Sequence, residues 1–144
     1  MILKVKKLHK DAKLPTHGHP GDAAMDFYCL EAVRFSPGKQ ERVRTGVAIE
    51  IPEEHVGLIW DKSSLSFNLG LKVMGGVIDA GYRGEIIMNL LNVSDKEVLL
   101  TKDHKVAQML IQKFEHCDIL EVNEISETVR GAGREGSTGL KHKI

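Results

Sequence analysis

The spacing of turn-forming residues constrains this chain more than any other feature. Apolar residues recur at short range, and Gly, Pro, Asn or Asp interrupts them about every eight to twelve residues, as in β-sandwiches and barrels. Alternation is clearest where Val47, Ile49 and Ile51 fall on one face of a strand. We therefore expect an all-β domain with at most one short helix, in residues 63–71. The candidate strands are residues 2–8, 42–51, 56–60, 85–92, 98–100 and 105–112, and the candidate turns are residues 36–39, 92–96 and 102–104.

The length of the chain limits its domain organisation. Its 144 residues, 42% of them apolar, are enough for one well-formed core and too few for two. From about Ser126 the sequence becomes glycine-rich and polar. We therefore predict a β domain in residues 1–125 and a mobile C-terminal arm in residues 126–144, which is not a separate domain.

Charge and cysteine content exclude several classes of partner. Lys plus Arg (20) equals Asp plus Glu (20), so no excess of positive charge favours binding to a nucleic-acid polymer. No apolar run is long enough for a signal peptide or a membrane span. Cys29 and Cys117 lie far apart and lack metal-type spacing, which indicates two reduced, buried thiols. We therefore expect a cytoplasmic protein without a nucleic-acid or membrane partner.

The arm contains a dinucleotide-binding fingerprint that its context contradicts. Residues 131–136 match G-x-G-x-x-G, but that motif must open a helix of a βαβ unit, and only eight residues follow Gly136. A P-loop is also excluded, because Ser137 stands where the lysine is required. The glycines still allow backbone amides to approach an anion beside Arg130, Ser137 and Thr138. A flexible tail explains the same residues equally well.

Residues 60–65 combine a cation, two hydroxyl groups and the start of the expected helix. Lys62, Ser63 and Ser64 could bind phosphate there, since the first N–H groups of a helix favour anions. From these residues alone an ordinary N-cap is the simpler interpretation, with Ser63 or Ser64 as the cap and Lys62 in solvent.

Residues 76–85 predict a hairpin with a carboxylate at its turn. Val77 and Ile78 lead into Asp79, a glycine-bearing turn follows, and Tyr82 begins the return to an apolar strand. An aspartate before a tight turn is often only an Asx-turn residue. The chemical alternative is a rigidly held carboxylate that accepts a proton from water.

In order, five segments of the chain resemble the five motifs of the trimeric dUTPase family, and five matches in the right order are highly specific. They are residues 21–28, 61–66, 76–85, 105–111 and 130–139. The resemblance implies a distorted jelly-roll β-sandwich or barrel, three copies of which share active sites at their interfaces. It also implies hydrolysis of dUTP to dUMP and pyrophosphate, which limits uracil in DNA and supplies dUMP for dTMP synthesis.

The resemblance also assigns roles to residues. Asp79 would be the general base for water that attacks the α-phosphorus. Tyr82 would exclude a 2′-hydroxyl group, and Mg²⁺ would bind phosphate oxygens and waters, with Asp26 holding a metal-bound water. The pair His17 and His19 is assigned to a loop rather than to a metal site. Backbone groups of Gly76, Val77 and Ile78 would read uracil, and the phosphates would be held by Lys62, Ser63, Ser64, Gln108, Arg130, Gly136, Ser137 and Thr138.

Two departures from the family pattern concern the substrate. Lys62 replaces the usual arginine, so a point charge replaces a bidentate fork. Arg134 and Glu135 stand where the family commonly has an aromatic ring that covers the base. The missing ring keeps open a second hypothesis, a dUTP-binding regulatory protein without turnover.

A third hypothesis is a dCTP deaminase, which shares the fold. The glutamate that shuttles protons in deaminases aligns with Asn89, whose amide cannot do so. Asn89 therefore favours hydrolysis over deamination. Hydrolysis is favoured over the regulatory protein because the chain keeps the full set of chemical groups: Asp26, Ser63, Asp79, Tyr82, Gln108 and Arg130.

Overall fold

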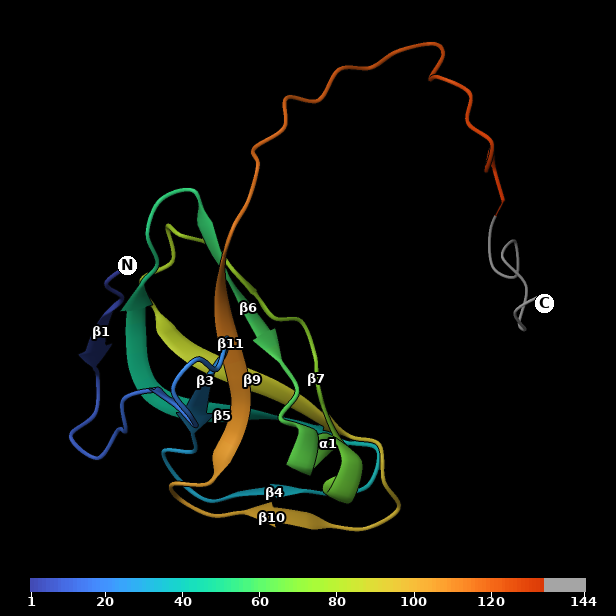
Figure 1. Cartoon of the computed structure of the whole chain (residues 1–144). Coiled ribbons are helices and arrows are strands. Elements are labelled where there is room, and N and C mark those ends of the chain that lie inside the picture. The colour runs from blue at the N-terminus through green and yellow to red at the C-terminus, as the bar shows by residue number, and fades with distance from the viewer. Residues whose placement is uncertain (134–144) are drawn as a thin grey trace.

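The computed structural model describes residues 1–133 and is built mainly from β-strands (Figure 1). Its one helix, α1 (Ser63–Leu69), lies between β6 and β7. The strands are β1 (Lys4–Lys7), β2 (Thr16–His17), β3 (Met25–Tyr28), β4 (Val33–Phe35), β5 (Gln40–Glu50), β6 (His55–Trp60), β7 (Leu71–Val73), β8 (Val77–Ile78), β9 (Glu85–Asn92), β10 (Val98–Leu100) and β11 (Lys105–Lys113).

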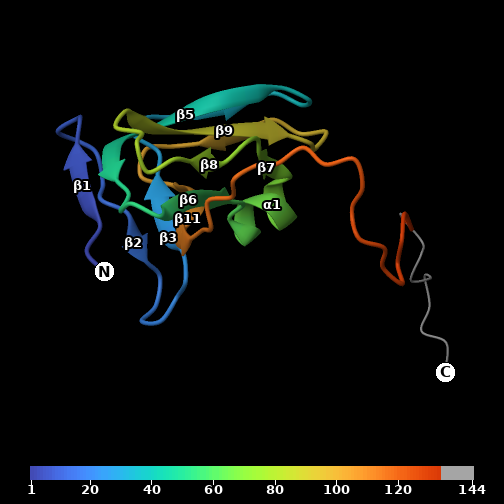
Figure 2. The same ribbon diagram turned by 90° about the horizontal axis from the view of Figure 1, so that it is seen from above.

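The strands form a two-layered antiparallel sandwich. One sheet has the order β1-β5-β9-β7, the other the order β2-β3-β11-β6-β8, and β10 pairs separately with β4. Figure 2 shows β5 and β9 lying over β6, β11 and β3. The core fills the space between the layers, with Phe27 and Met109 from one sheet and Ile86 and Met88 from the other at most 1% exposed. The expected all-β fold is confirmed.

A bulge at Gly46 bends β5 where it crosses the core. The register with β9 shifts between Arg44 and Ala48, and Gly46 adopts a φ of 70°, which strongly favours glycine. A Cβ atom at Gly46 would lie 2.8 Å from the Cβ of Ala12. The backbone conformation and the close contact therefore both require glycine at this position.

All the longer strands were predicted, but of the strands with four residues or fewer only β1 and β10 were. The structure confirms strands at residues 85–92 and 98–100, and it confirms the other four within two residues at each end. It adds β2, β3, β4, β7 and β8, which have two to four residues each. The helix ends at Leu69 rather than at Leu71, because Gly70 adopts the left-handed conformation (φ 66°) that terminates helices.

The predicted hairpin at residues 76–85 is wrong in one respect. A turn is present, with the N–H of Tyr82 donating to the carbonyl of Asp79 at 3.0 Å. The flanking strands do not pair with each other: β8 pairs with β6 and β9 pairs with β5 and β7. The segment therefore crosses from one sheet to the other, and long-range pairing with other strands outweighs local pairing across the turn.

The two cysteines differ in their environment. Both are free thiols, but only Cys29 is buried, and burial raises its pKa to about 11. Cys117 is exposed, because it lies beyond the last strand, so the expectation of two buried thiols is wrong for Cys117.

Residues 114–133 form no helix or strand and run away from the sandwich (Figure 1). Large apolar side chains in this segment face solvent, including Ile119 (98% exposed), Leu120 (80%) and Ile125 (87%). The domain boundary at residues 125 and 126 stays a prediction. Within residues 1–133, no helix has the length and apolar character needed to cross a membrane.

Candidate functional site

Asp26 is the centre of a charged cluster built by three elements. It lies on β3 opposite Gln108 of β11, and only 2% of its surface is exposed. The Nζ atom of Lys62, just before α1, lies 2.6 Å from Asp26 Oδ1, and the Nζ atom of Lys105, at the start of β11, lies 2.7 Å from Oδ2. Two ammonium groups therefore share one buried carboxylate.

The electrostatics of this cluster favour an anion. Burial alone would raise the pKa of Asp26, but Lys105 and Lys62 outweigh it and hold that pKa below its ordinary value. Asp26 in turn raises the pKa of Lys105. With all three groups charged, the cluster carries a net charge of +1. Asp26 Oδ2 is buried and has no hydrogen-bond partner within residues 1–133, although it is close to the Lys105 ammonium group.

The start of α1 lies beside the cluster and is not capped as expected. Lys62 occupies the N-cap position in an extended conformation, and no side chain within the described chain caps the helix, so the interpretation of Ser63 or Ser64 as the N-cap is wrong. Both serines are exposed. The first N–H groups of the helix and the serine hydroxyl groups remain available to a ligand next to Lys62.

Gln108 positions the segment that carries Lys62. Its Nε2 atom donates to the carbonyl of Asp61 at 2.8 Å. The Asp61 carboxylate in turn accepts from the N–H of Val73 at 2.7 Å and pairs with Lys72 at 2.6 Å. The link from β6 to α1 is therefore fixed from β11 on one side and from β7 on the other.

A second group of residues surrounds a cavity at the crossing between the sheets. The cavity has a volume of about 230 Å³, and Asp79 is an exposed residue on its wall. Tyr82 is 45% exposed there. The lining residues are Val77, Ile78, Asp79, Tyr82, Glu85 and Ile87.

Strand β8 presents backbone groups at this cavity. It is an edge strand of its sheet within the described chain, so one side of it has no strand partner. Gly76 differs from Val77 and Ile78, because its carbonyl already accepts from the N–H of Ile59 at 2.7 Å. Its φ is 132°, and a Cβ atom would lie 2.7 Å from the Ile59 carbonyl oxygen, so this approach requires glycine.

One chain does not unite the two groups in a single cavity. None of Lys62, Ser63, Ser64 and Gln108 lines the cavity that holds Asp79. Arg130 lies in the extended segment, where its Nε donates to the carbonyl of Gly133 at 3.3 Å. Gly136, Ser137 and Thr138, together with Arg134 and Glu135, lie outside the described residues.

The predicted loop histidines are held by local contacts. His17 ends the short strand β2, and its Nδ1 lies 3.1 Å from the carbonyl oxygen of Ala24, while the N–H of His19 donates to Asp22. Among residues 1–133, no three His, Cys, Asp or Glu side chains gather where they could hold a metal ion.

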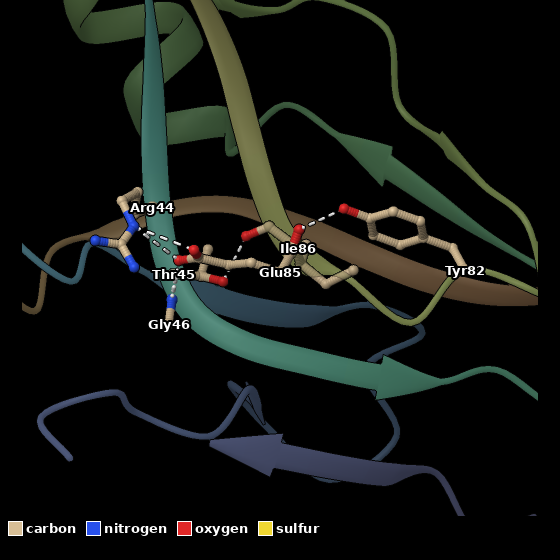
Figure 3. Close-up of polar contacts among 6 residues, drawn as sticks. All are labelled: Arg44, Thr45, Gly46, Tyr82, Glu85 and Ile86. Carbon is tan, nitrogen blue, oxygen red and sulfur yellow. Dashed lines mark hydrogen bonds and ion pairs between the residues drawn. The ribbon is translucent and has the colours of Figure 1, made fainter. Parts of the chain in front are cut away.

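Two residues at these sites, Lys105 and Glu85, were not predicted from the sequence. Lys105 was part of a matched motif, and its place at the head of that segment was the only signal available. Glu85 lines the Asp79 cavity and contacts β5 through the bulge (Figure 3). No local pattern marks this contact, because Glu85 and Gly46 are 39 positions apart.

Comparisons with known proteins agree with the motif order. A family model described as dUTPase matches residues 10–139. The deoxyuridine 5'-triphosphate nucleotidohydrolase of Clostridium tetani is 43% identical over 139 residues, with 95% of this chain and 96% of the relative covered. The enzyme of the same name from Thermobifida fusca is 42% identical, with 95% and 78% covered.

Solved structures extend the likeness to the fold. A dUTPase of Staphylococcus bacteriophage 80alpha with dUpNHpp has a TM-score of 0.86 and 29% identity, with 96% of this chain and 99% of that chain covered. A mutant dUTPase of S. aureus phage phi11, which coordinates a structural Mg(II) ion, has a TM-score of 0.82 and 25% identity, with 88% and 100% covered. The match over most of the chain, with relatives above 40% identity, means that this chain belongs to the dUTPase family.

Proposed function

We propose that this chain hydrolyses dUTP to dUMP and pyrophosphate, with Asp79 as the general base for water that attacks the α-phosphorus. The observation that carries this proposal is an exposed carboxylate on a fixed turn beside Tyr82 and a free strand edge, in a member of the dUTPase family. Such a carboxylate can accept a proton from water, which typically contributes about 10²–10⁴-fold to the rate.

The nucleoside would bind in the Asp79 cavity. The free edge of β8 offers backbone donors and acceptors that can pair with the edge of uracil. With cytosine, hydrogen-bond donors of the base would face donors of the backbone. Each buried group left unpaired would weaken binding by about 1–3 kcal/mol. The Tyr82 ring would pack against the sugar and leave no room for a 2′-hydroxyl group.

The triphosphate would bind to the Lys62–Asp26–Lys105 cluster. Its net positive charge, the hydroxyl groups of Ser63 and Ser64 and the open start of α1 all favour phosphate oxygens. Arg130 and, from the part of the chain beyond the described residues, Gly136, Ser137 and Thr138 would complete the charge clamp.

A magnesium ion fits this arrangement when it arrives with the triphosphate. Magnesium keeps much of its water shell and is held by phosphate oxygens with few carboxylates. Asp26 Oδ2 has the Lys105 ammonium group 2.7 Å away but no partner with hydrogen-bond geometry within residues 1–133, so it could accept from a metal-bound water. The metal would neutralise phosphate charge. The chain's own residues would orient the triphosphate and hold the base.

We further propose that the active protein is a homotrimer with shared sites. The support for shared sites is that the residues of the charged cluster do not line the Asp79 cavity within one chain, so a second copy could supply the missing groups. The exposed apolar side chains of residues 114–133 support contact with another copy.

Asp79→Asn tests the proposed mechanism. The variant should bind dUTP as the wild type does and lose hydrolysis by roughly 10²–10⁴-fold, because the amide cannot accept the proton. Pyrophosphate release and calorimetric binding measure the two effects. Asp95→Asn, at an exposed turn between β9 and β10, is the matched control and should keep full activity.

Other results would point elsewhere. A near-normal rate in Asp79→Asn would remove Asp79 from the mechanism. Ammonia released from dCTP by the wild type would indicate a deaminase. Tight dUTP binding without pyrophosphate release in magnesium buffer would indicate a regulatory binding protein.

A further inference from the structure

We propose that Glu85 is a positioning residue that sets the preference for deoxyribose over ribose by holding Tyr82 in place. This inference rests on the proposed function, because it assigns sugar selection to the same cavity. Glu85 is the first residue of β9, and its side chain is 16% exposed on the cavity wall.

The Tyr82 ring is fixed by the backbone of Glu85. Its hydroxyl group donates to the Glu85 carbonyl at 3.0 Å (Figure 3). The ring lies directly over Gly84, where any Cβ atom would collide with the Tyr82 hydroxyl group. The Tyr82 ring is therefore held against the backbone of Gly84 and Glu85.

Glu85 is in turn fixed to β5 by its carboxylate. Oε1 accepts from the N–H of Gly46 at 2.8 Å, and Oε2 accepts from Nε of Arg44 at 3.1 Å (Figure 3). These charge-assisted hydrogen bonds are stronger than neutral ones. The buried hydroxyl group of Thr45 donates to the carbonyl of Ile86 at 2.6 Å, which holds the next residue of β9.

The Glu85 carboxylate lies at the bulge of β5, where regular pairing with the start of β9 is interrupted. The paired positions of β5 and β9 stop at Arg44 and resume at Ala48, so the regular ladder is interrupted opposite the start of β9. The side chain of Glu85 bridges this interruption by accepting the Gly46 N–H. Without the carboxylate, the Gly46 N–H loses its acceptor and the backbone of Glu85 becomes more mobile. Because the Tyr82 hydroxyl group is bonded to the Glu85 carbonyl, the Tyr82 ring becomes more mobile as well. The core contacts of Ile86 and Met88 stay in place.

Kinetics with two sugars test this role. We expect Glu85→Ala to lower the ratio of kcat/KM for dUTP over UTP by about tenfold, chiefly through KM, which is within the range that pocket contacts contribute to specificity. Glu85→Gln should lower this ratio less than Glu85→Ala does, because the glutamine amide oxygen can still accept from the Gly46 N–H. Arg44→Met should shift the ratio in the same direction. Glu97→Ala, which removes an exposed glutamate paired with Arg34 on β4, is the matched control and should leave the ratio unchanged.

A merely structural role for Glu85 would lower thermal stability or kcat for both nucleotides equally, and this result would overturn the inference. A wild-type ratio in Glu85→Ala would overturn it as well. If the wild type failed to hydrolyse dUTP, the proposed function would be wrong. Calorimetry with dUMP and UMP would then decide separately whether Glu85 controls sugar preference, and an unchanged binding ratio in Glu85→Ala would refute it.

Discussion

At the scale of single residues, Asp26 holds two positively charged side chains close together. Its carboxylate binds two ammonium groups that come from the residue before α1 and from the start of β11. A lysine has three N–H groups, so either ammonium can keep Asp26 as a partner while donating to phosphate. We expect two lysines in this arrangement to offset the loss of the bidentate fork that an arginine at position 62 would supply.

Lys105 should therefore contribute to substrate binding. Lys105→Met removes one of the two ammonium groups, and we expect KM for dUTP to rise on the order of tenfold with little change in kcat, the effect of one lost charge-assisted contact. Lys105→Arg should restore most of the affinity. Lys102→Met is the control, because the one ion pair of Lys102 within residues 1–133 is with the exposed Asp11 on the surface. Steady-state kinetics would refute this role if KM stayed at the wild-type value in Lys105→Met.

Individual residues were predictable where their chemistry showed in a local pattern. Asp79 and Tyr82 were found because they flank one turn, and the cavity contains both. The charge partner of Lys62 could not be read from the sequence, since Asp26 lies 36 positions away on a strand too short to recognise. Glu85 was missed for the same reason, because the hydrogen-bond partners of its carboxylate within residues 1–133 lie on β5, about 40 positions away in the sequence.

At the scale of elements, β5 shows why a bent strand suits this sandwich. The bulge at Gly46 lets one strand pair with β1 through residues 47–50 and with β9 mainly through residues 40–44. It also turns one backbone N–H toward Glu85. In a regular strand the Gly46 N–H would bond to the backbone of the neighbouring strand. It would then not be available to the Glu85 carboxylate at the start of β9.

Two glycine substitutions, one in the turn before β5 and one in β5 itself, separate backbone strain from packing. Gly38 and Gly46 have nearly equal φ angles, 69° and 70°, but only a Cβ atom at Gly46 would meet Ala12 and Leu30. Gly38→Ala should destabilise the protein by about 1–2 kcal/mol through the left-handed conformation. Gly46→Ala should cost about 1–3 kcal/mol more through overpacking. Urea unfolding measures both, and equal losses in the two variants would mean that the contact with Ala12 relaxes freely.

Long elements were predictable from the sequence, whereas most short ones, with β1 and β10 as exceptions, were not. An eight-residue strand such as β9 displays the alternation of apolar side chains, whereas the two residues of β8 display none. The pairing expected for the hairpin at residues 76–85 was wrong because strand pairing also depends on residues far away in the sequence. A turn formed by Asp79 and Tyr82 is local, but which sheet each flanking strand joins depends on Gly57 and Ala48, far away in sequence.

At the scale of the whole molecule, the chemical groups are divided between two regions of each chain. We expect a chain ending at Val129 to keep its thermal stability and lose most turnover, because Arg130 and the glycines beyond it are removed while the core is untouched. Differential scanning calorimetry and pyrophosphate release measure the two properties. Full activity of the shortened chain would mean that the arm plays no part in catalysis.

Mixing variants tests whether sites are shared. Asp79→Asn chains and chains ending at Val129 should each be inactive alone. After joint unfolding and refolding in equal amounts, random assembly should restore about a quarter of wild-type activity, since one site in four combines an intact Asp79 with an intact arm from another copy. No recovery in the mixture would place each site within one chain.

The exposed apolar side chains of residues 114–133 also bear on the order of events during protein synthesis. The ribosome makes the sandwich before this segment, and domains fold as they emerge. The sandwich can therefore begin to fold before this apolar segment leaves the ribosome. We expect copies of the chain to associate through the segment only after their sandwiches have folded.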